Sequence, residues 1–398
     1  MKIFRRSKEI PSGVWALGFV SMFMDISSEM IHGLLPVFLV TVLGASAVTI
    51  GMIEGIGEGL ALVTRVFSGV ISDRLGKRKF LAGLGYFLGT ISKPLFAAAA
   101  SVQMALAARS FDRFGKGLRG APRDALIADL TPQPLRGAAY GLRQSLDSVG
   151  AFVGPFLAVA LMLATGNAFR RIFWIAGLFG LAAVAILVVF VKEPETQKSP
   201  AGQSPIQPSA FSQLSRPYFG VLGLGVIFTL ARFSEAFLLL RAENVGLAAE
   251  YIPFILVILS LVYALGAYPA GRLSDRIGRM APLGAGLLVL VLAELVLAAA
   301  DSVLLVAVGA ALWGLHLAFT QGLFAALVAD TAAEDVRGTA FGLFGLATGI
   351  SMLIASVLAG WLWDRYSPQA TFLAGSIFSF LALIGFIMLR GRLEKNAS

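Results

Sequence analysis

Long apolar stretches recur along the whole chain and are separated by shorter polar segments. Stretches long enough to cross a bilayer, about 20 residues, lie at approximately 13–42, 47–71, 79–100, 103–130, 138–165, 170–192, 217–242, 250–272, 281–300, 302–329, 339–363 and 369–390. None shows the alternation of period two that is typical of barrel strands, and a backbone at that depth must satisfy its own hydrogen bonds. The pattern therefore predicts an all-α membrane protein with twelve transmembrane helices.

The composition supports a membrane protein. Of the 398 residues, 57% are hydrophobic and 14% are charged, whereas soluble domains average about 45–50% and 25%. We interpret the net charge of +9 as a bias of Lys and Arg toward cytoplasmic loops, and not as affinity for nucleic acid. The absence of cysteine excludes disulfides, thiolate metal sites and cysteine nucleophiles.

Basic residues mark one side of the membrane. They precede the first span, follow the second and eighth spans and end the chain, whereas loops 42–48 and 98–103 carry no charge. The first span is too long for a signal peptide and lacks a small-x-small cleavage site, so we expect it to be retained. Because positive loops stay inside, both termini are predicted to be cytoplasmic, in a plasma membrane of the bacterial inner-membrane type.

The two halves of the chain resemble each other. The sequence GVISDRLG at 69–76 recurs as GRLSDRIG at 271–278, and RGAAYGL at 136–142 recurs as RGTAFGL at 337–343. The offsets, 202 and 201 residues, agree, and such repeats occur in transporters whose substrate site lies between the halves. We therefore predict a six-helix bundle at 1–192, a polar cytoplasmic linker at 193–216 and a second six-helix bundle at 217–398.

Three motifs carry a resemblance to a known family. The loop after span 2, from Gly69 to Lys79, reads GVISDRLGKRK, and span 4 has R-x-x-x-G-x-x-x-A from Arg113, with Arg119 where a small residue is usual. Span 5 contains Gly141, Gly150, Gly154 and Pro155. With these motifs the chain resembles the major facilitator superfamily over essentially its whole length, and the span 5 motif is similar to that of the family's proton-coupled exporters. Glycines in a membrane helix can also serve only close packing.

The resemblance implies two bundles related by pseudo-two-fold symmetry, which rock to give alternating access. It also implies a cytoplasmic latch, in which Asp73 lies by the start of span 11, a helix N-terminus that favours a carboxylate, and Lys77 pairs with Asp129. The alternative is that these loops are basic only because cytoplasmic loops of membrane proteins are enriched in Lys and Arg. The latch candidates are Gly69, Asp73, Arg74, Gly76, Lys77 and Asp129, with Asp275, Arg279 and Asp330 as the sister set.

Span 1 carries Asp25, Glu29 and His32 at i, i+4 and i+7, which places them on one helical face. Such groups in a poorly hydrated cavity could bind and release protons near neutral pH. They could instead bind a divalent metal or an organic cation, or pair with basic residues in a static network. Glu54 and Glu58 in span 2 are further candidates for proton or substrate binding.

Span 4 is unusually rich in charge, although its sister region 310–330 carries only Asp330, so the fold does not require these charges. A cationic stripe could bind an anionic substrate group, or its members could pair with acidic residues of spans 2 and 5 as a gating network. The candidates are Arg109, Asp112, Arg113, Lys116, Arg119, Arg123, Arg143 and Asp147, with Arg232 and Glu235 as the few equivalents in the second half.

These features predict a secondary transporter. The first expectation is proton-coupled export of an amphipathic or drug-like compound, by antiport. The alternative is proton-coupled transport of an organic anion, metal ion or metal chelate through the charged first bundle. No enzymatic activity is expected, since the chain lacks a nucleophile and base arrangement and a phosphate-binding G-x-x-x-x-G-K-[ST] loop. We expect no cofactor besides the proton gradient, a small-molecule substrate and the lipid bilayer as partners, no nucleic acid, and a monomer.

Overall fold

The computed structural model describes residues 10–193, 213–278, 280–321, 323–333 and 336–397, and among them it contains helices and no strand. Eleven of the helical segments found there are long and apolar enough to cross a membrane. Each predicted span corresponds to a helix or to a broken pair of helices, and the fourth, at 102–130, has too many charges to qualify by composition. The chain is an all-α integral membrane protein, as predicted.

The helices form two compact units. One consists of Met1–Leu35 and Leu60–Ser204, and the other of Pro36–Gly59 and Pro205–Ser398. This grouping differs from the predicted bundles because residues 36–59 belong to the second unit. Residues 194–212, which make up most of the predicted linker, lie outside the described residues.

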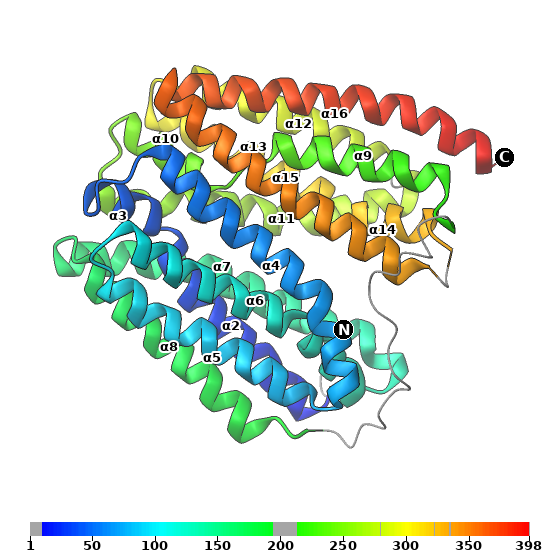
Figure 1. The fold of residues 1–398 in the computed structure, drawn as a ribbon, viewed down its shortest axis with the longest axis horizontal. Helices are drawn as coiled ribbons and strands as arrows, with labels where there is room; N and C mark the ends of the chain where they lie inside the picture. Colours follow the sequence, from blue (N-terminus) through cyan, green and yellow to red (C-terminus); the bar gives the residue numbers. More distant parts are fainter. Residues whose placement is uncertain (1–9, 194–212, 279, 322, 334–335, 398) are drawn as a thin grey trace. The chain divides into compact units, whose positions relative to one another are not determined.

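The first unit is built mainly from long helices without a break (Figure 1). Its elements are α2 (Ser12–His32), the second part of α4 (Ala47–Leu75), α5 (Arg78–Ala98), α6 (Val102–Leu130), η2 (Gln133–Leu135), α7 (Arg136–Thr165) and α8 (Phe169–Phe190). Helix α2 packs against α7 and α8, and α5 packs against α6 and α8.

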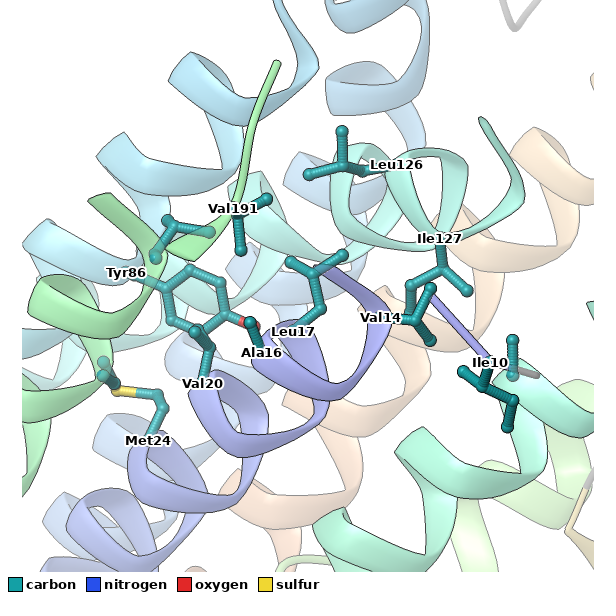
Figure 2. Packing of buried hydrophobic residues seen from close by; sticks show 13 residues of the cluster. Ile10, Val14, Ala16, Leu17, Val20, Met24, Tyr86, Leu126, Ile127 and Val191 are labelled. Atoms are coloured by element: carbon teal, nitrogen blue, oxygen red, sulfur yellow. The ribbon is translucent and has the colours of Figure 1, made fainter. Parts of the chain in front are cut away.

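Apolar side chains of α2 form much of the core of this unit. Val14, Leu17 and Val20 are fully buried, one turn apart, and pack in a cluster with Tyr86 of α5. Figure 2 shows the Tyr86 ring directed at α2 between apolar neighbours. The Tyr86 hydroxyl lies 3.2 Å from Ser21 Oγ, so the ring joins this apolar core to the polar residues nearby.

The second unit contains more helices because several of its spans are interrupted. Its elements are α3 (Leu35–Thr41), the first part of α4, α9 (Arg216–Ala231), α10 (Ala236–Asn244), η4 (Ala249–Tyr251), α11 (Phe254–Ile277), α12 (Met280–Ala299), α13 (Val303–Thr320), α14 (Leu323–Thr331), α15 (Arg337–Arg365) and α16 (Pro368–Ala397). Helix α13 packs against α11 and α12, and α16 packs against α9 and α12.

Glycines explain why the first part of α4 belongs to the second unit. A Cβ on Gly51 would lie 2.0 Å from the carbonyl oxygen of Ser356 in α15, and one on Gly360 would lie 2.3 Å from that of Ala47. Only residues without a side chain allow two backbones to approach so closely. Asp364 of α15 then accepts hydrogen bonds from the backbone N–H groups of Ala47 and Val48, at 3.0 and 2.8 Å, and so caps the N-terminus of α4.

Candidate transport site

The acidic face of α2 is divided between a bonded and an unbonded carboxylate. Glu29 Oε2 lies 3.3 Å from His32 Nδ1. Asp25 makes no hydrogen bond or ion pair with the described residues, but it interacts electrostatically with Asp147 of α7 and with Lys116 and Arg119 of α6. No group of three His, Cys, Asp or Glu side chains in the described chain is arranged to hold a metal, so the metal alternative gains no geometric support there.

The glycines of the span 5 motif hold α7 against this acidic face. A Cβ on Gly150 would lie 2.9 Å from the Cβ of Asp25, and one on Gly154 would lie 2.8 Å from the Cβ of Glu29. Gly141 has open space around its Cα instead, with nothing within 4 Å of an added Cβ. Two of the three glycines are therefore packing residues, and what they pack against is the backbone of α2 and the Cβ atoms of its two intramembrane acidic residues.

Asp112 of α6 is the centre of a buried network. Its carboxylate accepts a hydrogen bond from Lys93 Nζ of α5 at 2.6 Å, and it lies 3.9 Å from Arg109 and 4.0 Å from Arg113. Lys93 also donates to Ser28 Oγ of α2 at 3.2 Å. The predicted site residues did not include Lys93, although its position in the interior of an otherwise apolar span was a signal that could have identified it.

Arg119 occupies a groove made by two glycines of α5. A Cβ on Gly85 would lie 2.8 Å from the Cβ of Arg119, and one on Gly89 would lie 3.1 Å from its Nη1. The guanidinium carbon lies 5.1 Å from the centroid of the Tyr86 ring. Arg119 is only 4% exposed, and it makes no hydrogen bond or ion pair within the described part of the chain, where its buried Nη1 lacks an acceptor. The glycines of α5 thus explain how an arginine fits where a small residue is usual.

The other charges near the end of α6 are paired. Arg123 donates to Asp124 Oδ1 from both Nε and Nη2 at 3.1 Å, and from Nη1 to Ser21 Oγ at 3.1 Å. In α7, Arg143 Nη1 donates to Asp147 Oδ2 at 2.6 Å. These contacts agree with the alternative in which the charges of span 4 take part in a network of internal pairs.

The loop between α4 and α5 forms an ion-pair cluster, but with a different cation from the predicted one. Arg78 donates to Asp129 Oδ2 at 2.5 Å and to Asp73 Oδ1 at 3.1 Å, while Lys77 is exposed. The predicted pair between Lys77 and Asp129 is therefore wrong. Helix α5 begins at Arg78, and this start directs Arg78 toward the carboxylates.

The remaining latch candidates have structural roles or fall outside the description. Gly76 follows α4 with φ +62°, a left-handed conformation that favours glycine. Gly69 faces the Cβ of Ala121 at 3.4 Å, so it lets α4 approach α6. Of the sister set, Arg279 and the side chain of Asp275 lie outside the described residues.

In the second unit, acidic residues gather at the break in span 7. Arg232 follows the end of α9 and Glu235 precedes α10, so each charge has the sign favoured by its helix terminus. Ser234 Oγ donates to Glu54 Oε2 at 3.4 Å, and Arg232 interacts electrostatically with Glu235 and Glu58. Sequence reasoning considered Glu54 and Glu58 as partners of span 4 and missed these contacts with span 7.

His316 has a fixed tautomer. Its Nδ1 lies 2.8 Å from the Gly286 carbonyl oxygen; a carbonyl can only accept, so Nδ1 carries the proton. The ring also packs against Phe228. These contacts indicate that His316 is a packing residue.

Known proteins resemble the chain over nearly all of its length. The profile of the Major Facilitator Superfamily matches residues 17–240 and 221–398. The MFS-type transporter MJ1317 of Methanocaldococcus jannaschii is 35% identical over 381 residues, which are 94% of each chain. The quinolone resistance protein NorA of Staphylococcus aureus is 22% identical over 58% of this chain and 59% of its own. The structure of a bacterial homolog of the human lysosomal transporter Spinster aligns with a TM-score of 0.77 at 16% identity, covering 96% of both chains. The chain belongs to the major facilitator superfamily.

Proposed function

We propose that this transporter is a proton-coupled exporter of small amphipathic compounds, working by alternating access and antiport, in which Asp25 exchanges a proton for substrate. The observation that carries the proposal is the surroundings of Asp25. Its carboxylate has no bonded partner among the described residues, while Lys116, Arg119 and Asp147 act on it from two other helices. A carboxylate among charges of both signs changes its proton affinity whenever one of those charges moves.

Glu29 is assigned a different role. It is bonded to His32 on its own helix, so rearrangement of α6 or α7 does not remove its partner. Asp25 depends on those helices for all of its charged neighbours except Glu29. We therefore assign coupling to Asp25 and a supporting role to Glu29.

The direction of transport rests on two weaker supports. The span 5 motif is similar to that of proton-coupled exporters, although two of its glycines also serve packing here. NorA, whose name describes quinolone resistance, matches more than half of the chain. The proposal places the protein as a monomer in a membrane of the bacterial inner-membrane type, with both termini cytoplasmic. Arg78 closes its cytoplasmic latch.

The test uses purified protein in proteoliposomes with an acidic lumen. Uptake of the fluorescent quinolone norfloxacin is measured together with proton release from the lumen. Asp25→Asn should abolish proton-driven uptake but keep exchange of labelled for unlabelled norfloxacin without a gradient, because exchange requires no change in protonation. Glu29→Gln should keep proton-driven uptake.

Asp301→Asn serves as the control, since this exposed acid lies between α12 and α13, in the unit that does not contain Asp25. Full proton-driven uptake by Asp25→Asn would refute the assignment of coupling. Loss of exchange together with uptake, even at saturating norfloxacin, would assign Asp25 to structure and not to coupling.

A further inference from the structure

Two opposite charges in the first unit interact without touching. Arg119 and Asp25 influence each other electrostatically, yet no ion pair within 4 Å joins them and neither has another bonded partner within the described residues. An ionised group held inside a membrane protein without a bonded counter-ion is costly. The arrangement thus leaves a positive and a negative group, on α6 and α2, that a bound molecule could satisfy together.

The setting of Arg119 shows that its position is built and not accidental. Gly85 and Gly89 clear the space for its side chain, and Tyr86 lies under the guanidinium. The Tyr86 hydroxyl is itself positioned by Ser21. Gly85, Gly89 and Tyr86 thus fix the position of the Arg119 side chain, but none of them supplies an acceptor for its N–H groups.

We propose that Arg119 and Asp25 form a subsite for zwitterions, in which a substrate carboxylate binds the Arg119 guanidinium and a substrate ammonium binds the Asp25 carboxylate. The inference rests on the proposed transport function and names its substrate class: amphipathic molecules that carry both charges. A purely cationic substrate would be repelled by Arg119 and Lys116, and a purely anionic one by Asp25 and Asp147. Only a zwitterion meets an opposite charge at both positions.

The same geometry explains antiport. An ammonium group and a proton compete for one carboxylate, so the zwitterion binds when Asp25 is ionised and leaves when it is protonated. The charged or titratable groups that face this pair are Glu29 on α2, Tyr86 and Lys93 on α5, Lys116 and Arg123 on α6 and Asp147 on α7.

The experiment compares three probes of matched shape. Phenylalanine is the zwitterion, phenylalaninamide carries only the ammonium, and N-acetylphenylalanine carries only the carboxylate. Equilibrium binding to the purified transporter is measured by calorimetry at constant pH, without a gradient. The wild-type protein should prefer phenylalanine by at least about tenfold over either relative, the value of one good charge-assisted contact.

The variants should remove this preference one charge at a time. Arg119→Met should bind phenylalaninamide as well as it binds phenylalanine. Asp25→Asn should bind N-acetylphenylalanine as well as it binds phenylalanine. Arg119→Lys keeps the positive charge and should keep the ranking, and Arg136→Gln, which removes an exposed arginine at the start of α7, should behave as wild type. A lack of binding by all three probes, or an unchanged ranking in Arg119→Met or Asp25→Asn, would overturn the subsite.

The thermal midpoint separates this role from a structural one. Methionine fills a similar space over Tyr86 without a buried charge, so Arg119→Met should unfold at a temperature equal to or above that of the wild type. A lower midpoint in Arg119→Met, with the ranking unchanged, would show that Arg119 is structural. Binding in the predicted ranking without proton-driven flux would refute the proposed coupling and leave the subsite standing.

Discussion

Alanine at Gly150 provides the sharpest test of how α7 supports the acidic face of α2. The added Cβ would lie 2.7 Å from the Met22 carbonyl oxygen and 2.9 Å from the Cβ of Asp25. Carbon atoms pack at about 3.5–4.0 Å, so α2 and α7 must separate by roughly 0.5–1 Å. Such overpacking costs about 1–3 kcal/mol and moves the carboxylate of Asp25 away from its neighbours.

Gly141 offers a matched control in the same helix and motif. Nothing lies within 4 Å of a Cβ added there, so Gly141→Ala should gain about 0.5–1 kcal/mol from the lower flexibility of alanine. Because the same gain applies at Gly150, the two variants should differ by the packing cost, about 1–3 kcal/mol.

Thermal unfolding of the purified proteins in detergent measures this difference. The midpoint should fall in Gly150→Ala and rise in Gly141→Ala, and proton-driven uptake should fall in Gly150→Ala. Midpoints that fall equally in both variants would refute the packing argument, because they would show that the cost does not depend on contact with α2.

Three further changes test other contacts. Arg78→Gln should lower the free energy of unfolding by about 1 kcal/mol, because it removes two partly exposed ion pairs, whereas Lys77→Gln should be neutral in the same thermal assay. Asp364→Ala should cost about 0.5–2 kcal/mol through loss of the cap on α4, seen as faster amide exchange in the first turn of that helix. Lys93→Met should cost about 3–5 kcal/mol, because Asp112 would lose its shortest bonded partner in the buried network; a thermal midpoint near that of the wild type would contradict the importance of this pair.

The spans were predictable because the bilayer imposes a length and a hydropathy on every helix that crosses it. The charged helix α6 was also predictable in position, but its partners were not. Lys93 is adjacent to Asp112 only through the register of α5 on α6, and Arg78 replaces Lys77 through the residue at which α5 begins. Such choices depend on tertiary packing, which a single sequence does not reveal.

The break in span 7 was unpredictable for a similar reason. No proline or glycine interrupts residues 231–236. The non-helical turn there places Phe233 among the rings of Phe237, Trp313 and Phe372. Each such aromatic pair contributes about 0.5–1.5 kcal/mol, and together the pairs can offset the backbone hydrogen bonds that the break removes.

The two units thus accommodate polarity inside the membrane by different physical means. In the second unit, the ends of broken helices provide partial charges of both signs, and Arg232 and Glu235 each lie at the terminus that favours them. In the first unit, α6 is continuous, so its charges are paired by side chains, either on α6 itself, as Arg123 with Asp124, or on another helix, as Asp112 with Lys93. Movement of one helix therefore removes partners from another in the first unit more directly than in the second. This difference agrees with the proposed coupling at Asp25 of α2, whose charged neighbours lie mainly on α6 and α7.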